Sequence, residues 1–137
     1  VAKVTTGLFI DSTMEYGNGV ITSAPLGIVN GPDGNLWFTE VADLVGQSDT
    51  SGTITEHDVD TSGCVPLSIT VGSDDMLWYT CYQHSMLGRT DPGDPGNPES
   101  HTLFANSEPT GIVSGPGGAL WFVDEGLRSV GYMVPPL

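Results

Sequence analysis

Apolar positions along the chain follow the short alternating pattern of β-strands. An amphipathic helix would need apolar residues sustained at i, i+3, i+4 and i+7, and no stretch of the sequence has them. Short stretches such as 53–57 and 101–104 instead alternate between apolar and polar residues, and Gly and Pro separate them from their neighbours. The pattern therefore predicts an all-β fold built from many short strands.

The chain contains three copies of one sequence unit, which begin at Pro25, Pro66 and Pro109. Besides the proline, four positions are identical in all three copies: Ile28/Ile69/Ile112, Gly31/Gly72/Gly115, Leu36/Leu77/Leu120 and Trp37/Trp78/Trp121. Every Trp of the chain thus occupies one repeat position, and successive Trp residues are 41 and 43 residues apart. A fixed period of this length is the signature of a repeat architecture.

Each unit contains four strand-like stretches. The first follows the repeat proline, and the second carries Leu-Trp-aromatic after a tight turn such as 31–34. The third contains a recurring glycine (46, 88 and 131), and the fourth alternates. Four strands in about 40–45 residues are typical of one β-propeller blade. We therefore expect one domain, 1–137, with three four-stranded blades of about 42 residues at 25–65, 66–108 and 109–137.

The ends of the repeat pattern predict that two chains associate. Residues 1–5 resemble the end of a third strand and 7–13 a fourth, whereas the last unit ends with its third strand near 130–134. Closed propellers need about 4–8 blades. We expect a six-bladed ring formed by a head-to-tail homodimer, in which strand 7–13 of one chain completes the last blade of its partner and covers the open sheet edge. The alternative is a fragment of a longer propeller.

The three Trp residues and one turn-rich stretch are expected to have structural roles. The Trp residues, because of their identical repeat position, are expected to pack between blades rather than to stack on sugars. The turn-rich stretch 91–98, Asp-Pro-Gly-Asp-Pro-Gly-Asn-Pro, is expected to form a rigid loop, because it lacks the ligand spacing of a calcium loop.

The charge of the chain narrows its possible partners. Seventeen Asp and Glu residues against three Lys and Arg residues give a net charge of −14. Phosphate backbones and anionic headgroups repel such a chain, so binding to nucleic acid or to a membrane surface is not expected. No apolar run reaches the roughly 18–20 residues of a transmembrane helix, and the chain opens with Val and without a signal region. These features favour a mature or trimmed secreted chain.

The midpoint between Cys64 and Cys81, 72.5, falls inside the turn 72–75, which makes them cross-strand partners at one end of a hairpin. A disulfide is geometrically reasonable there and suits an oxidising, extracellular compartment. Two free thiols are the alternative. A structural zinc site is not expected, because no further ligand with zinc spacing accompanies the pair.

The stretch 25–40, Pro-Leu-Gly-Ile-Val-Asn-Gly-Pro-Asp-Gly-Asn-Leu-Trp-Phe-Thr-Glu, resembles the repeat of the streptogramin B lyase family, and 45–46 and 52–56 continue the match. The resemblance implies a propeller with more blades in one chain, which opens a cyclic depsipeptide at its ester by elimination. A His removes the proton alpha to the carbonyl, and Mg²⁺ stabilises the enolate. The family's catalytic His residues follow the repeat proline, where this chain has Leu26, Leu67 and Thr110.

The resemblance also implies metal-associated carboxylates directly before the repeat proline and four residues after the Trp. Both are present in the third unit, as Glu108 and Glu125; the first two units have Ala24, Val41, Val65 and Tyr82 there. An antiparallel blade brings these positions together near the channel mouth, with Asp124 beside them and Glu40 on another blade. Clustered carboxylates repel unless a proton or cation intervenes. We expect Glu108, Glu125 and Asp124 to bind Mg²⁺ or Ca²⁺; solvated rim acids are the alternative.

The remaining candidates concern proton transfer and ligand binding. His84 follows Cys81 on the same face as the acid pair and is the one His that could replace the missing base; an exposed loop His is the alternative. Glu40, Tyr82 and Thr110 are expected to contact a small polar ligand. Two functions therefore remain open: a metal-assisted lyase, and a non-catalytic, lectin-like propeller that binds a glycan or a peptide.

Overall fold

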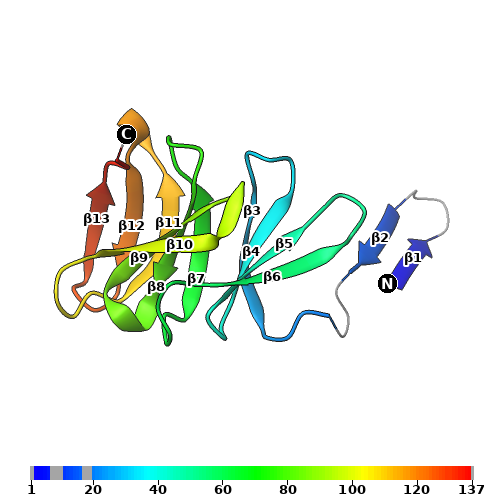
Figure 1. Cartoon of the computed structure of the whole chain (residues 1–137), viewed down its shortest axis with the longest axis horizontal. Coiled ribbons are helices and arrows are strands. Elements are labelled where there is room, and N and C mark those ends of the chain that lie inside the picture. Colours follow the sequence, from blue (N-terminus) through cyan, green and yellow to red (C-terminus); the bar gives the residue numbers. More distant parts are fainter. Residues whose placement is uncertain (1, 7–10, 17–19, 137) are drawn as a thin grey trace.

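The computed structural model describes residues 2–6, 11–16 and 20–136, and the regular structure of these residues is almost entirely antiparallel β-sheet (Figure 1). The strands are β1 Ala2–Thr6, β2 Asp11–Glu15, β3 Pro25–Asn30, β4 Leu36–Glu40, β5 Leu44–Ser48, β6 Ile54–Asp58, β7 Pro66–Val71, β8 Leu77–Cys81, β9 Met86–Asp91, β10 Asp94–Thr102, β11 Pro109–Ser114, β12 Leu120–Asp124 and β13 Ser129–Met133. Two short 3₁₀ turns interrupt them, η1 Tyr82–His84 and η2 Pro116–Gly118. The prediction of an all-β fold is confirmed.

Three sheets follow one another in chain order. The first sheet is β3-β4-β5-β6, the second is β7-β8-β9-β10, and the third is β11-β12-β13. Figure 1 shows them side by side along the long axis of the molecule, with β13 at one end and the β1–β2 hairpin at the other. In the described part of the chain, the third sheet has no fourth strand beside β13. The closed ring and the homodimer remain predictions.

The N-terminal strand predicted at 7–13 lies partly outside the described residues, since 7–10 are not among them. The described strand nearest to it, β2, covers Asp11–Glu15 and pairs with β1 of the same chain. None of the helical segments in the described ranges is long and apolar enough to cross a lipid bilayer.

The prediction of a rigid loop at 91–98 is wrong, because β10 begins at Asp94 and continues to Thr102. The strand pairs with β9 at Asp94 and again from Glu99, with an irregular register between them. Since β10 is the outermost strand of its sheet, Pro95 and Pro98 need not donate backbone hydrogen bonds to a further strand.

The recurring glycine of the third strand is explained by the aromatic residue opposite it. Gly88 pairs with Tyr79 across β8 and β9, and a Cβ on Gly88 would lie 1.9 Å from the Cε2 atom of Tyr79. The same arrangement recurs for Gly46 with Phe38 and for Gly131 with Phe122. The aromatic ring therefore lies flat over the neighbouring strand, which a side chain there would prevent.

The hydrophobic core consists of layers between successive sheets. We call the face of a sheet that looks towards the next sheet its leading face, and the opposite face its trailing face. Trp37 and Val45 on the leading face of the first sheet pack against Ile69, Leu77 and Tyr79 of the second. The second layer repeats this packing with the equivalent residues Trp78, Leu87, Ile112, Leu120 and Phe122. Trp37 and Trp78 thus pack between sheets, as expected from their repeat position.

Candidate functional site

Each of the three sheets has an equivalent backbone hydrogen bond at the same end of its inner hairpin, the hairpin formed by its first two strands. The amide of the residue after the second strand donates to the carbonyl of the residue before the repeat proline: Val41 to Ala24 (3.1 Å), Tyr82 to Val65 (3.4 Å) and Glu125 to Glu108 (3.0 Å). In the third sheet, both of these positions carry Glu. The structure therefore brings Glu108 and Glu125 side by side, and both are exposed to solvent.

Tyr82 connects the second sheet to this acid pair. The negative charges of Glu108 and then Glu125 raise the pKa of Tyr82 above its usual value. The phenol is therefore protonated at neutral pH and is available as a hydrogen-bond donor near the acid pair. Tyr82 opens η1, the 3₁₀ turn that follows β8.

Asp124 lies beside the pair but points into the protein, where it is only 5% exposed. One carboxylate oxygen accepts a hydrogen bond from the Ser107 hydroxyl, and the other accepts from the amides of Glu108 and Leu127, both at 3.0 Å. Burial acts to raise the pKa of Asp124, but these hydrogen bonds outweigh it and leave the pKa below its usual value. Asp124 therefore fixes the two backbone segments that present Glu108 and Glu125.

Asp124 and Ser107 form a side-chain contact at the open end of the inner hairpin, and the other two sheets have a contact between residues at the same two repeat positions. In the second sheet the same positions hold Cys64 and Cys81, which form the predicted disulfide with a Cα–Cα distance of 4.5 Å. In the first sheet they hold Ser23 and Glu40, and the Ser23 amide donates to Glu40 Oε2 at 3.2 Å. We call these three pairs the hairpin bridges. The sequence contains their signal, because each pair stands two residues before and fifteen after its repeat proline.

Glu40 is fully buried on the first sheet, away from the acid pair on the third. Its Oε1 atom has no hydrogen-bond donor in the described structure. Burial is the main cause that raises the pKa of Glu40 to about 7, and the nearby Glu56 carboxylate adds to it. Glu56 is itself held by the amide and the hydroxyl of Thr22, at 2.6 and 2.9 Å. The structure leaves no exposed surface on Glu40 for a ligand to contact.

His84 and the residues after the repeat prolines lie in different surroundings. His84 is exposed at the end of η1, close enough to Gly63 that a Cβ there would lie 2.9 Å from its Nε2 atom. Thr110 is half-buried, and its carbonyl accepts a hydrogen bond from Thr80 Oγ1 at 3.2 Å. Leu26 is exposed, whereas the carbonyl of Leu67 accepts from Thr39 Oγ1 at 2.9 Å.

The donor chemistry of the acid pair fits Mg²⁺ better than Ca²⁺. Across residues 2–6, 11–16 and 20–136, no three His, Cys, Asp or Glu side chains come together as a metal-binding group. Two carboxylates are nevertheless the usual protein contribution to a Mg²⁺ site, in which waters and substrate oxygens complete the octahedron; Ca²⁺ takes six to eight oxygen ligands. Glu108 and Glu125 would hold the ion, and Asp124 would position them.

Residues 6–135 match the virginiamycin B lyase family. Among solved structures, the chain is similar to a catalytically inactive virginiamycin B lyase from Staphylococcus aureus with quinupristin: 32% identity, a TM-score of 0.73, and coverage of 85% of this chain and 43% of that one. A streptogramin B lyase is 34% identical, with a TM-score of 0.70 and coverage of 85% and 42%.

A gluconolactonase from Xanthomonas campestris is 19% identical, with a TM-score of 0.60 and coverage of 78% of this chain and 37% of that one, and shares the fold alone. No curated protein matches. The chain spans less than half the length of the solved lyases that it resembles.

Proposed function

Because the chain belongs to the virginiamycin B lyase family, we propose that it supplies a Mg²⁺ site to a lyase-like propeller, with Glu108 and Glu125 as the metal ligands. The observation that carries this proposal is the backbone hydrogen bond from Glu125 to Glu108, which sets two exposed carboxylates side by side. All three sheets have this backbone hydrogen bond, but only the third has carboxylates at both of its ends. The other two sheets have Ala24 with Val41 and Val65 with Tyr82 at the same positions. The pair is therefore not a general requirement of the repeat.

The surrounding residues prepare the pair for a cation. Asp124 holds the amides of Glu108 and Leu127, so the two segments that carry the carboxylates stay in register. The Tyr82 phenol keeps its proton beside the two carboxylates, whose negative charges raise its pKa. When bound, Mg²⁺ would stabilise negative charge that develops on a carbonyl oxygen of the ligand. Ca²⁺ is the alternative ion.

A small polar ligand would then bind next to the ion, with Tyr82 and the half-buried Thr110 as its contacts. The disulfide between Cys64 and Cys81 supports an extracellular location. Non-catalytic binding of a glycan or peptide is the second candidate, and it is favoured by Leu26, Leu67 and Thr110 at the positions of the family's catalytic His. His84 is the remaining candidate base of the described chain.

Thermal unfolding with Mg²⁺ tests the metal site. We expect MgCl₂ to raise the unfolding midpoint of the unmodified chain beyond the rise in NaCl of equal ionic strength, because an ion that binds only the folded state stabilises it. Glu108→Gln and Glu125→Gln should abolish this difference while preserving side-chain size. Asp75→Asn, which removes an exposed carboxylate from the β7–β8 turn, is the matched control and should keep it. Equal responses in all four proteins would exclude the site.

Quinupristin, the compound seen with the similar lyase, distinguishes the two functions. After incubation with the chain and Mg²⁺, reversed-phase chromatography separates the cyclic compound from a ring-opened product. Intact quinupristin indicates that this chain does not perform the elimination, which favours the binding function. A ring-opened product that disappears with His84→Ala would instead identify a lyase with an unusual base.

A further inference from the structure

The peptide group between Ser107 and Glu108 is held on both of its edges. Its carbonyl oxygen accepts a hydrogen bond from the Ser85 hydroxyl at 2.8 Å. Its amide, that of Glu108, donates to Asp124 Oδ1 at 3.0 Å. Because a peptide group is planar, contacts on opposite edges fix the orientation of the whole plane. The next carbonyl, that of Glu108, accepts from the Glu125 amide at 3.0 Å, so the backbone on both sides of the Glu108 side chain is held.

The contact from Ser85 crosses from one sheet to the next. Ser85 directly follows η1 in the connection between β8 and β9 of the second sheet, whereas Glu108 directly precedes β11 of the third. Tyr82, whose pKa is raised by the charges of the acid pair, opens the same 3₁₀ turn. The second sheet therefore contributes two groups to this end of the molecule: a phenol beside the carboxylates, and a hydroxyl that holds the backbone of one of them.

Ser85 is itself anchored in an uncommon backbone conformation. Its φ of 50° lies in the left-handed region, which residues other than glycine rarely adopt. Two hydrogen bonds hold it there, because the hydroxyl donates to Ser107 O and the Ser85 carbonyl accepts from the Leu103 amide at 2.7 Å. Such a conformation persists where the surrounding contacts over-determine it. The Ser85 hydroxyl is therefore a fixed support for the Ser107 carbonyl.

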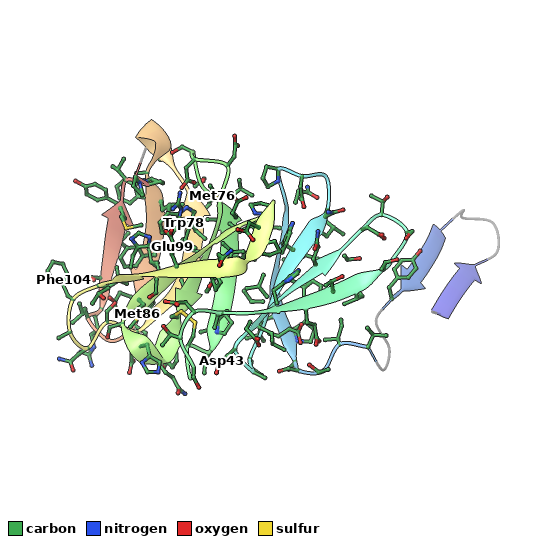
Figure 2. All side chains as sticks on the ribbon, in the orientation of Figure 1. Asp43, Met76, Trp78, Met86, Glu99 and Phe104 are labelled. Carbon is green, nitrogen blue, oxygen red and sulfur yellow. A yellow bond between two sulfur atoms is a disulfide. The ribbon has the colours of Figure 1, made fainter. Side chains whose placement is uncertain are left out.

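The junction between the first and second sheets uses a different contact. There Asp43 accepts from the amides of Gly63 and Val65, at 2.6 and 3.0 Å. Figure 2 shows Asp43 near the boundary between these two sheets. Leu44, the residue of the first sheet at the repeat position of Ser85, has no hydroxyl to donate. The Ser85 contact is therefore particular to the junction that leads to the acid pair.

We propose that Ser85 is a positioning residue of the acid pair, through which the second sheet fixes the backbone of Glu108 and hence the direction of its carboxylate relative to Glu125. This inference rests on the proposed Mg²⁺ site. Two neighbouring carboxylates repel each other without a cation, so the backbone that presents them has to resist their separation. Contacts that orient metal ligands typically change the affinity by about 10–100-fold, so loss of the Ser85 hydroxyl should weaken Mg²⁺ binding about tenfold.

Amide hydrogen exchange, followed by NMR on the metal-free protein, tests the support of the peptide plane. We expect Ser85→Ala to make the Glu108 amide exchange about fivefold faster, the factor that corresponds to one net hydrogen bond. The Gly115 amide, which donates to Ala119 O at the other end of the third sheet, should keep its rate. Ser85→Gly removes the same hydroxyl but adopts the left-handed conformation freely, so it should show the same change with no loss of fold. Unchanged Glu108 exchange in both variants would overturn the proposal.

Calorimetric titration with MgCl₂ tests the link to the metal site, with a dissociation constant about tenfold larger expected for both Ser85 variants. Ser73→Ala is the matched control, because the Ser73 hydroxyl also joins the second sheet to the third, donating to Gly118 O at 2.9 Å from the opposite end of the hairpin. It should bind Mg²⁺ like the unmodified chain. Unchanged affinity in both Ser85 variants would overturn the proposal. If the unmodified chain bound no Mg²⁺, the proposed metal site would fail instead, and the exchange of the Glu108 amide would decide whether Ser85 fixes its backbone.

Discussion

Trp121 shows how one replaced residue changes a repeat unit. The indole N–H of Trp37 donates to Asp33 at 3.0 Å, and that of Trp78 donates to Asp74 at 3.1 Å. Gly117 occupies the equivalent turn position, and the buried Nε1 atom of Trp121 has no acceptor among the described residues. An unsatisfied buried donor costs about 1–3 kcal/mol. The third unit thus lacks the indole acceptor that the other two units have, although its pattern of apolar residues is intact.

Glu40 should make stability depend on pH above the usual range of a carboxyl group. Its pKa rises from 4.5 to about 7 on folding, so the fold favours the protonated form. The stability that this form contributes is complete below pH 4.5 and is lost as the pH rises through about 7. Glu40→Gln cannot ionise and keeps the size of the side chain. Between pH 5 and pH 8, we expect the unfolding free energy of this variant to fall by about 2–3 kcal/mol less than that of the unmodified chain.

Urea unfolding at the two pH values measures this difference. Both proteins contain the other carboxylates, including Glu56 and Asp124, whose pKa values are lowered. The contributions of these groups to the pH dependence therefore cancel when the two proteins are compared. Asp75→Asn removes one exposed carboxyl and should follow the unmodified chain. Parallel pH profiles for Glu40→Gln and the unmodified chain would contradict the raised pKa of Glu40.

Sequence reasoning succeeded where the repeat register determines neighbours. Cys64 and Cys81 are symmetric about one turn, so their disulfide could be predicted, and the same register placed Glu108 beside Glu125. The burial of Glu40 could not be predicted. It depends on the neighbouring Glu56 and on Ser23, whose amide binds its carboxylate, and neither contact follows from the alternation of apolar positions.

At the scale of elements, the contact between sheets depends on a hydroxyl near the end of the second strand in the first two sheets. Thr80 is fully buried, accepts from the amide of Ser68 at 3.1 Å, and donates to the carbonyl of Thr110 at 3.2 Å. One side chain therefore ties its own hairpin to the next sheet. Thr39 has the same role between the first and second sheets, with Gly27 and Leu67 as its partners.

Thr80→Val should test this link without changing the shape of the residue. We expect a loss of about 1–3 kcal/mol of unfolding free energy, because the Ser68 amide and the Thr110 carbonyl lose a buried partner. The matched control is Val123→Thr at the equivalent, half-exposed position of the third sheet, which should change stability by less than about 0.5 kcal/mol. Similar urea midpoints for the two variants would refute the role of the hydroxyl.

Strands were predictable from the sequence where they alternate, and less so where the backbone departs from regular pairing. The predicted fourth strand at 53–57 corresponds to β6, Ile54–Asp58. The strand predicted at 101–104 overlaps the end of β10, whose earlier part was hidden by Pro95 and Pro98, which only an edge strand tolerates. The register shifts that follow each repeat proline, such as that between Pro66 and Ile69, also escaped prediction because they leave no periodic signal.

At the scale of the whole molecule, charge opposes compactness. The chain of 137 residues has a net charge of −14, because it has 17 acidic and only three basic side chains. Arg89, which bonds to Asp74 and Glu99, compensates only a small part of the negative charge. Repulsion among exposed carboxylates destabilises the folded chain, and it should also oppose association of two copies.

Raising NaCl from low to physiological concentration should consequently stabilise the fold. We expect the thermal midpoint to rise by about 4 °C, the shift that ~1 kcal/mol produces in a domain of this size. A variant with two fewer exposed carboxylates, Asp58→Asn with Asp75→Asn, should respond less. A midpoint that falls with salt, or an equal response of both proteins, would show that repulsion does not limit stability.

The hairpin bridges make three nearly identical units chemically unequal. A thiol reductant opens the bridge of the second sheet by cleaving the bond between Cys64 and Cys81. A pH above about 7 acts on the first sheet, where Glu40 then ionises, and strong acid acts on the third, where the Asp124 carboxylate accepts from Ser107. Each reagent therefore addresses a different part of the row of sheets. The solvent therefore selects which bridge is weakened, although the three units share one repeat pattern.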